Sequence, residues 1–126
     1  MFAYGLDHVQ LAIPTGTEHR ARAFYVDVLG LTEVEKPDHL KNRGGMWFES
    51  EGLRLHLGAD PDFVPARKAH PALLVRRLAE LIARCEEAGC PVHRDAPLEG
   101  FERVYVFDPV GNRIELLEPV SAFDPV

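Results

Sequence analysis

The chain has 126 residues, of which 46% are hydrophobic, and a formal net charge of −6 at pH 7. This size and composition suit one soluble globular domain, or two small halves that share a core. The acidic balance, with a pI near 5.5, argues against nucleic acid or an anionic membrane as a partner and favours small molecules.

The first residues, MFAYGLDHVQLAIP, lack a basic segment ahead of the apolar ones and include Asp7 and His8, so they predict a strand and not a signal peptide. No apolar run approaches the length that crosses a membrane. We therefore expect a cytoplasmic protein. Cys85 and Cys90 match neither a zinc knuckle nor a CxxC redox pair, which favours reduced structural thiols.

The first half of the chain predicts one strand, one helix and three further strands. Residues 8–13 alternate and end at Pro14, and the stretch TGTEHRARAFYVDVLG then has apolar residues at helical spacing. Residues 31–37 are expected to form a strand, which the loop DHLKNRGG follows. MWFES and LRLHLG flank EG as a hairpin.

The second half repeats this order after the linker ADPDFVPARK. HPALLV, residues 70–75, predicts a strand, and the apolar residues of the next segment mark a helix that ends at Gly89. PVHRD is a weak strand, and ERVYVF and NRIELLEP flank a turn as a second hairpin. The turn letters DPVGN are assigned to structure, because they supply the backbone angles that a tight turn requires.

The two halves overlay with a nearly constant offset, which indicates a duplicated unit. His8 and His70 differ by 62 positions, and five further pairs differ by 59: Gly30 and Gly89, Phe48 and Phe107, Gly52 and Gly111, Arg54 and Arg113, and His56 and Glu115.

Strand alternation turns four polar side chains of this repeat away from the core. Because Leu53, Leu55 and Leu57 are expected to face the core, His56 faces the opposite way, and the same parity applies to His8, His70 and Glu115. Three imidazoles and one carboxylate from separate strands predict a site for zinc, nickel, cobalt, iron or manganese. The competing interpretation is four unrelated polar residues on a solvated sheet face. The unpaired histidines His19, His39 and His93 are expected to face solvent.

The same parity predicts the lining of a cavity that is mostly apolar. Tyr105 could donate a hydrogen bond to a substrate oxygen, and Arg103 either holds a carboxylate or phosphate or reaches solvent. Trp47, of opposite parity to Phe48, is expected to pack beneath a helix. The substrate-binding candidates are Gln10, Phe48, Arg103, Tyr105 and Phe107, with Met46, Leu74 and Leu117 beside them.

At these residues the chain resembles the vicinal oxygen chelate superfamily, which includes glyoxalase I, fosfomycin thiol transferases, extradiol dioxygenases, methylmalonyl-CoA epimerases and bleomycin-resistance proteins. The resemblance rests on LDHVQLAIP, AFYVDVLGLTEVEKP, LHLG, HPALLV and DPVGNRIELLEP, in the family's order over nearly the whole chain. These motifs are specific for the fold and are shared by members with unrelated chemistry.

The resemblance implies an α+β fold in which two βαβββ modules form an open, cup-like mixed sheet. One glyoxalase-like domain would span residues 1–126, with module one at 4–60, a linker at 59–68 and module two at 69–120. It also implies a divalent metal ion, zinc, nickel, iron or manganese, held by the first and last strands of each module, hence by His8, His56, His70 and Glu115. A homodimer acting on a small-molecule substrate is typical of the family.

The resemblance further implies glyoxalase-type lyase or isomerase chemistry, in which the metal stabilises an enediolate while Glu115 serves as the base and Tyr105 assists. One departure is that many glyoxalases have a glutamate at the position of His56. His8, His70 and Glu115 also match the two-histidine, one-carboxylate set of an iron dioxygenase, and the same positions match thiol transferases. A non-catalytic drug- or aromatic-binding protein of bleomycin-resistance type, or a degenerate member, remains the alternative.

Overall fold

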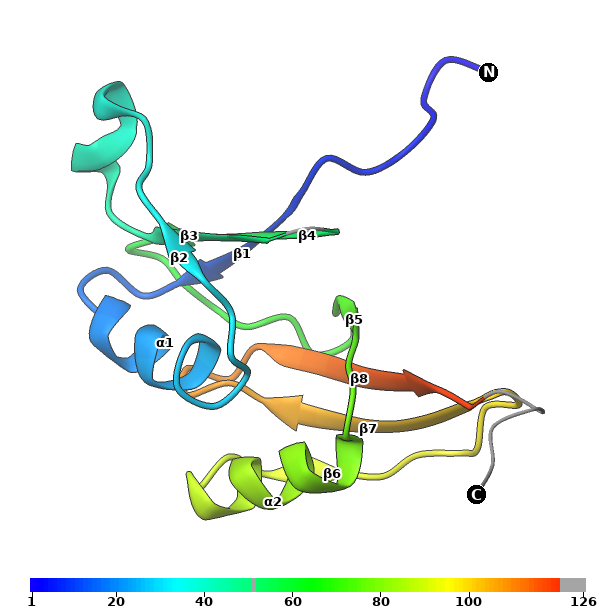
Figure 1. Ribbon diagram of the computed structural model, residues 1–126. Helices are drawn as coiled ribbons and strands as arrows, with labels where there is room; N and C mark the ends of the chain where they lie inside the picture. The colour runs from blue at the N-terminus through cyan, green and yellow to red at the C-terminus, as the bar shows by residue number, and fades with distance from the viewer. Residues whose placement is uncertain (51, 121–126) are drawn as a thin grey trace. The chain divides into compact units, whose positions relative to one another are not determined.

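A computed structural model describes residues 1–50 and 52–120 and divides the chain into two compact units, Met1–Val64 and Pro65–Val126. Each unit contains a four-stranded mixed sheet and one α-helix (Figure 1). The repeated strand, helix and three strands predicted from the sequence are therefore confirmed, and the fold class is α+β.

The first unit has the strand order β1-β4-β3-β2. β1 pairs with β4 in parallel, whereas the other two pairs are antiparallel. A 3₁₀ helix at Asp38–Arg43 lies between β2 and β3. The remaining elements are β1 (Val9–Ile13), α1 (Glu18–Tyr25), β2 (Glu33–Val34), β3 (Met46–Ser50) and β4 (Leu53–Ala59).

Aromatic packing joins α1 to its sheet. Tyr25 stacks on Phe48 of β3 with ring centroids 5.3 Å apart, and Phe24 meets the Tyr25 ring edge to face at 4.9 Å. Both helix residues are fully buried, as are Ile13 and Leu55 of the sheet. This buried face stabilises the unit, because it removes large apolar side chains from water.

The second unit has the equivalent order β5-β8-β7-β6, again with a parallel pair, β5 with β8, at one edge. α2 packs against β6, β7 and β8 on one face of this sheet (Figure 1). The buried core includes Cys85 of α2 with Val104 and Leu116 of the sheet. The elements are β5 (Ala72–Leu74), α2 (Leu78–Glu87), β6 (Val92–His93), β7 (Phe101–Phe107) and β8 (Arg113–Pro119).

Local chemistry explains the ends of these elements. The buried Asp108 carboxylate accepts hydrogen bonds from the backbone N–H groups of Val110 and Asn112, which closes the β7–β8 turn as its DPVGN sequence predicts. α1 ends at Tyr25, earlier than the apolar spacing predicts. Burial raises the pKa of the Cys85 thiol to about 11, in agreement with a reduced structural residue.

The register of the first hairpin differs from the sequence prediction. His56 lies opposite Trp47, whereas its counterpart Glu115 lies opposite Tyr105. The residue numbers of equivalent positions in the two units therefore differ by 59 for His56 and Glu115 and by 58 for Trp47 and Tyr105. A shift of one residue along a strand moves every side chain to the other face. The predicted location of Phe48 in the site lining, and of Trp47 beneath the helix, is therefore wrong.

No helix in the described part of the chain combines the length and the apolar character needed to cross a membrane.

We expect Phe48→Ala to lower the free energy of unfolding by about 3–5 kcal/mol, because it removes a buried ring and its stack on Tyr25. Phe101→Ala, at a ring that is 36% exposed, should cost less than about 1 kcal/mol. Urea denaturation of the two variants measures the difference. Equal losses would place Phe48 on the exposed face after all.

Candidate functional site

In the first unit, the His56 ring lies within a stack of aromatic rings. The Trp47 ring is nearly parallel to it, with centroids 4.0 Å apart and planes 4° apart, and the His8 ring stacks on it at 4.3 Å. Since β4 runs between β1 and β3, the Trp47 and His8 rings approach from opposite sides. The stack buries His56 to 4% exposure and fixes the plane of its imidazole.

A carboxylate on the neighbouring strand holds one nitrogen of this ring. Nε2 of His56 lies 3.0 Å from Oε2 of Glu49, and the other Glu49 oxygen lies 3.9 Å from Nε of Arg54. Glu49 reaches this position because it is two residues from Trp47, on the same face of β3. A carboxylate beside His56 was not predicted from the sequence, and Glu49 of β3 provides one.

His8 is held in a similar way. Its Nδ1 lies 2.9 Å from Oδ1 of Asp7, and Arg54 donates to the other Asp7 oxygen at 3.0 Å. The hydrogen bond with His8, assisted by the charge of Arg54, holds the pKa of the Asp7 carboxyl below its ordinary value. Arg54 thus bridges the two carboxylates, Asp7 and Glu49, that hold the two histidines.

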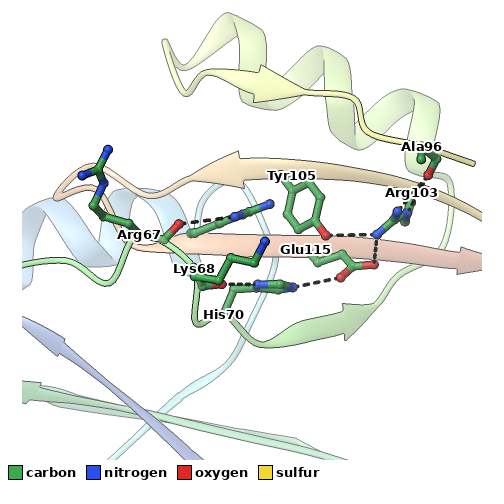
Figure 2. Close-up of polar contacts among 8 residues, drawn as sticks. Arg67, Lys68, His70, Ala96, Arg103, Tyr105 and Glu115 are labelled. Atoms are coloured by element: carbon green, nitrogen blue, oxygen red, sulfur yellow. Dashed lines mark hydrogen bonds and ion pairs between the residues drawn. The ribbon is translucent and has the colours of Figure 1, made fainter.

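The second unit joins His70 to Glu115 (Figure 2). His70 precedes β5, and its Nδ1 lies 2.8 Å from the backbone oxygen of Lys68. Its Nε2 lies 3.1 Å from Oε1 of Glu115, which β8 carries at a position that is 7% exposed. Ala72 pairs with Glu115 as Gln10 pairs with His56, so His70 and His8 occupy equivalent positions in their sheets.

The contact between His70 and Glu115 places two acceptor atoms close together unless a proton or a cation lies between them. The Lys68 carbonyl can only accept a hydrogen bond, so Nδ1 of His70 carries the proton. In a neutral ring Nε2 then presents a lone pair to the lone pairs of Glu115, and these repel. Either a proton on this pair or a cation bound by both atoms relieves the repulsion.

The separation of these atoms suits a metal ion. Two ligand atoms that are each about 2.1 Å from an ion, at a right angle, are about 3 Å apart. Nε2 of His70 and Oε1 of Glu115 are 3.1 Å apart. The anchored Nδ1 is the arrangement by which proteins orient metal-binding histidines, and Asp7 anchors His8 in the same way. The pair therefore offers two donor atoms of the type and spacing that a divalent metal takes.

Arg103 holds the second oxygen of Glu115 at 3.4 Å. The same guanidinium nitrogen donates to the Tyr105 hydroxyl at 3.0 Å, and the other two nitrogens donate to the backbone oxygen of Ala96. These contacts turn Arg103 toward Glu115 and not into solvent (Figure 2). Tyr105 is further enclosed by the Arg113 guanidinium, 4.0 Å from its ring centroid, and by the edge of His70.

The structure thus brings the predicted ligands together in two pairs, His8 with His56 and His70 with Glu115. Within residues 1–50 and 52–120, no group of three or more His, Cys, Asp or Glu side chains could hold a metal ion. Of the predicted lining residues, Gln10 shares the face of His56, whereas Arg103, Tyr105 and Phe107 share the face of Glu115. Phe48 does not belong to the site.

Sequence reasoning missed Trp47, Glu49, Asp7 and Arg54. The acidic Asp7 directly before His8 was a usable signal, because metal-binding histidines commonly donate to a carboxylate. Trp47 and Glu49 are two residues apart, so they lie on the same face of β3. The register expected for the hairpin put that face away from His56.

Comparison with known proteins agrees with this fold. The family model described as Glyoxalase/Bleomycin resistance protein/Dioxygenase superfamily matches residues 5–116. A candidate glyoxalase family protein from Bacillus anthracis is similar at 42% identity and a TM-score of 0.88, over 95% of this chain and 98% of that one. No curated protein matches the sequence.

Two more distant structures share the fold. The fosfomycin resistance protein FosX from Listeria monocytogenes, complexed with Mn(II) and sulfate, is 17% identical, with a TM-score of 0.75 over 94% of this chain and 93% of that one. TnmS3, an antibiotic binding protein from Streptomyces sp. CB03234, is 22% identical, with a TM-score of 0.65 over 94% and 100% of the two chains.

We expect the ring protons of His56 to resonate upfield of those of exposed His19, because the Trp47 ring lies parallel to the His56 ring at 4.0 Å. Trp47→Leu should remove most of this shift in the proton–carbon NMR spectrum. Phe48→Leu, a substitution on the opposite face, should leave the shift in place. The reverse pattern would contradict the observed register.

Proposed function

The chain belongs to the Glyoxalase/Bleomycin resistance protein/Dioxygenase superfamily, and on that premise we propose that it is a metal-dependent enzyme of glyoxalase type, with lyase or isomerase chemistry on a small oxygenated substrate. The observation that carries this proposal is the His70–Glu115 pair, whose fixed tautomer and 3.1 Å separation suit a divalent ion. The second half of the proposed site is the His8–His56 pair of the first unit.

The proposed ligands are His8, His56, His70 and Glu115, and the proposed ion is zinc, nickel, iron or manganese. The presence of Mn(II) in the FosX structure supports a divalent ion in this fold. Nδ1 is engaged in both His8 and His70, so each would bind the ion through Nε2, and Nε2 of His70 faces Glu115, the other proposed ligand of its unit. His56 differs, because Glu49 engages its Nε2, so it would contribute through Nδ1 and more weakly.

When bound, such an ion supplies Lewis-acid stabilisation of negative charge on two neighbouring oxygens of a substrate. The chain supplies the base. Glu115 is buried and is held at one oxygen by Arg103, so its carboxylate is fixed for removing a proton from a carbon beside a carbonyl. The Tyr105 hydroxyl, which accepts from Arg103, is free to donate its own proton to a substrate oxygen.

We also propose a homodimer. Metal binding then has two arrangements, with the two ligand pairs of one site drawn from one chain or from two. A mixture of His8→Ala and His70→Ala chains distinguishes them. If each site is shared between two chains, random exchange of subunits gives mixed dimers in which one of the two sites has all four ligands, which is about one quarter of all sites in the mixture. If each site lies within one chain, no site in the mixture has all four ligands.

Metal binding tests the ligand set. After dialysis and loading with each of the four ions, elemental analysis of the wild type should give stoichiometric metal. His70→Ala and His8→Ala should each weaken binding by more than about 100-fold, and His56→Ala by about 10-fold, because its Nε2 is engaged by Glu49. Visible spectra of the cobalt-loaded proteins provide a readout that is independent of activity.

His39→Ala is the matched control, because His39 is exposed and outside both ligand pairs. It should bind metal as the wild type does. Equal weakening in His39→Ala, or no retained metal in the wild type with any ion, would contradict the metal site. The protein would then fit a binding module, of which TnmS3, an antibiotic binding protein, is an example with this fold.

Hydrogen exchange tests the base. In D₂O, with saturating metal, the wild type should exchange the proton beside the carbonyl in members of a panel of small hydroxyketones and thiol adducts of 2-oxoaldehydes, followed by proton NMR. Glu115→Gln should slow exchange at least about 100-fold, because the amide cannot accept the proton. Glu118→Gln serves as the control, since that carboxylate accepts from the backbone of Arg77 and Leu78. Exchange that survives in Glu115→Gln would remove the base role.

A further inference from the structure

A pocket of about 210 Å³ opens in the first unit directly beside His56. Its floor belongs to the sheet, and its wall to the segment between β2 and β3. The lining residues are Gln10, Leu57, Gly58, Ala59 and Trp47 of the sheet, and Lys36, Leu40, Arg43 and Gly44 of the wall.

The floor of the pocket is continuous with the candidate metal ligands. Trp47 stacks on His56 with one side of its ring system and also lines the pocket. Gln10 is the strand partner of His56, and Gly58 lies two residues after His56 on the same face of β4. A molecule in the pocket would therefore be adjacent to His56.

Gly58 keeps this floor open. A β-carbon at this position would lie 2.6 Å from the Gln10 side-chain nitrogen, which is too close for any real contact. A larger residue would force the Gln10 side chain to move from its present position. The absence of a side chain at Gly58 thus leaves room for Gln10 in the pocket lining.

The wall is fixed in place by specific hydrogen bonds. Gly44 and Gly45 both have positive φ, and a β-carbon at Gly45 would lie 2.0 Å from the Leu57 carbonyl oxygen, so the loop lies directly against β4. Glu18 accepts from the Gly45 N–H at 3.0 Å, and Lys36 donates to the Gly44 carbonyl. This binding of Gly45 lowers the pKa of Glu18 and commits that carboxylate to the loop.

The charge of the pocket is positive. Lys36 and Arg43 line it, and among the described residues of the lining none is acidic. The Arg43 guanidinium has no ion-pair or hydrogen-bond partner among the residues that the structure describes. Lys41 of the same 3₁₀ helix, in contrast, pairs with Asp38 at 3.0 Å and does not line the pocket. A cation without a partner in a pocket that also contains the Gln10 amide suits an anionic ligand.

We propose that this pocket binds an anionic oxygen group, a carboxylate or a phosphonate or phosphate, through Lys36 and Arg43. Leu40 and the Trp47 ring would contact the carbon skeleton that carries this group. The volume is below the 300–1,000 Å³ typical of drug-sized ligands, so the ligand is small or only one end of it enters. Its identification as the substrate rests on the proposed function, whereas anion binding itself does not.

Trp47 is the sole tryptophan of the chain, so its fluorescence reports on the pocket directly. The metal-free full chain is titrated with acetate and with methylphosphonate, with acetamide and dimethyl methylphosphonate as neutral counterparts, and calorimetry serves as the second readout. We expect saturable binding of at least one anion, weaker at high salt, and no binding of its neutral counterpart. The two anions distinguish carboxylate from phosphonate as the preferred group.

Arg43→Gln should weaken anion binding by about tenfold or more, because it removes a charged donor. Lys41→Gln, a change of the same kind on the same helix, should leave it unchanged. The proposal would be overturned if neither anion gave a binding signal in calorimetry, if the neutral compounds bound equally well, or if both variants lost anion binding to the same extent. Since no metal is present, failure here leaves the metal-binding result standing, and failure of the metal site leaves the anion result standing.

Discussion

The alternation of side chains along β4 and β8 is the constraint on which the rest of the structure depends. Each strand lies in the middle of its sheet, with leucine or isoleucine facing a helix and one ligand-type residue, His56 or Glu115, facing the other way. Burial of the apolar face therefore fixes the orientation of the polar one, because a shift by one residue would expose the core. The hydrophobic burial that stabilises each unit therefore also orients its candidate ligand.

This coupling explains why so much could be predicted from the sequence. The order of elements, the duplication and the faces of His8, His56, His70 and Glu115 all follow from alternation and apolar spacing, and the observed registers agree. Phe48 was misplaced for a physical reason. The pairing of two antiparallel strands depends on the length of the turn between them, and alternation within each strand carries no information about that length.

The groups that orient the candidate ligands were less predictable. The Lys68 partner of His70 is a backbone carbonyl, which every residue possesses, and the position of Glu49 depends on the pairing register of β3 with β4, which alternation does not determine. The anionic subsite depends on a loop conformation set by Gly44 and Gly45, and on where that loop meets β4. Such contacts arise from tertiary packing, whereas sequence patterns report mainly which face of an element is buried.

The unequal hairpins of the two units have an evolutionary consequence. When His56 of β4 is aligned with Glu115 of β8, the preceding strands β3 and β7 differ in pairing register by one residue. Trp47 and Glu49 of β3 therefore occupy the positions of Tyr105 and Phe107 of β7. Gain or loss of a single codon at such a turn changes which side chains of the preceding strand lie beside His56 or Glu115. The His56 or Glu115 side chain itself keeps its place. After duplication, two copies of one ancestral sheet can diverge in this way toward different tasks without an intermediate that loses its candidate ligand.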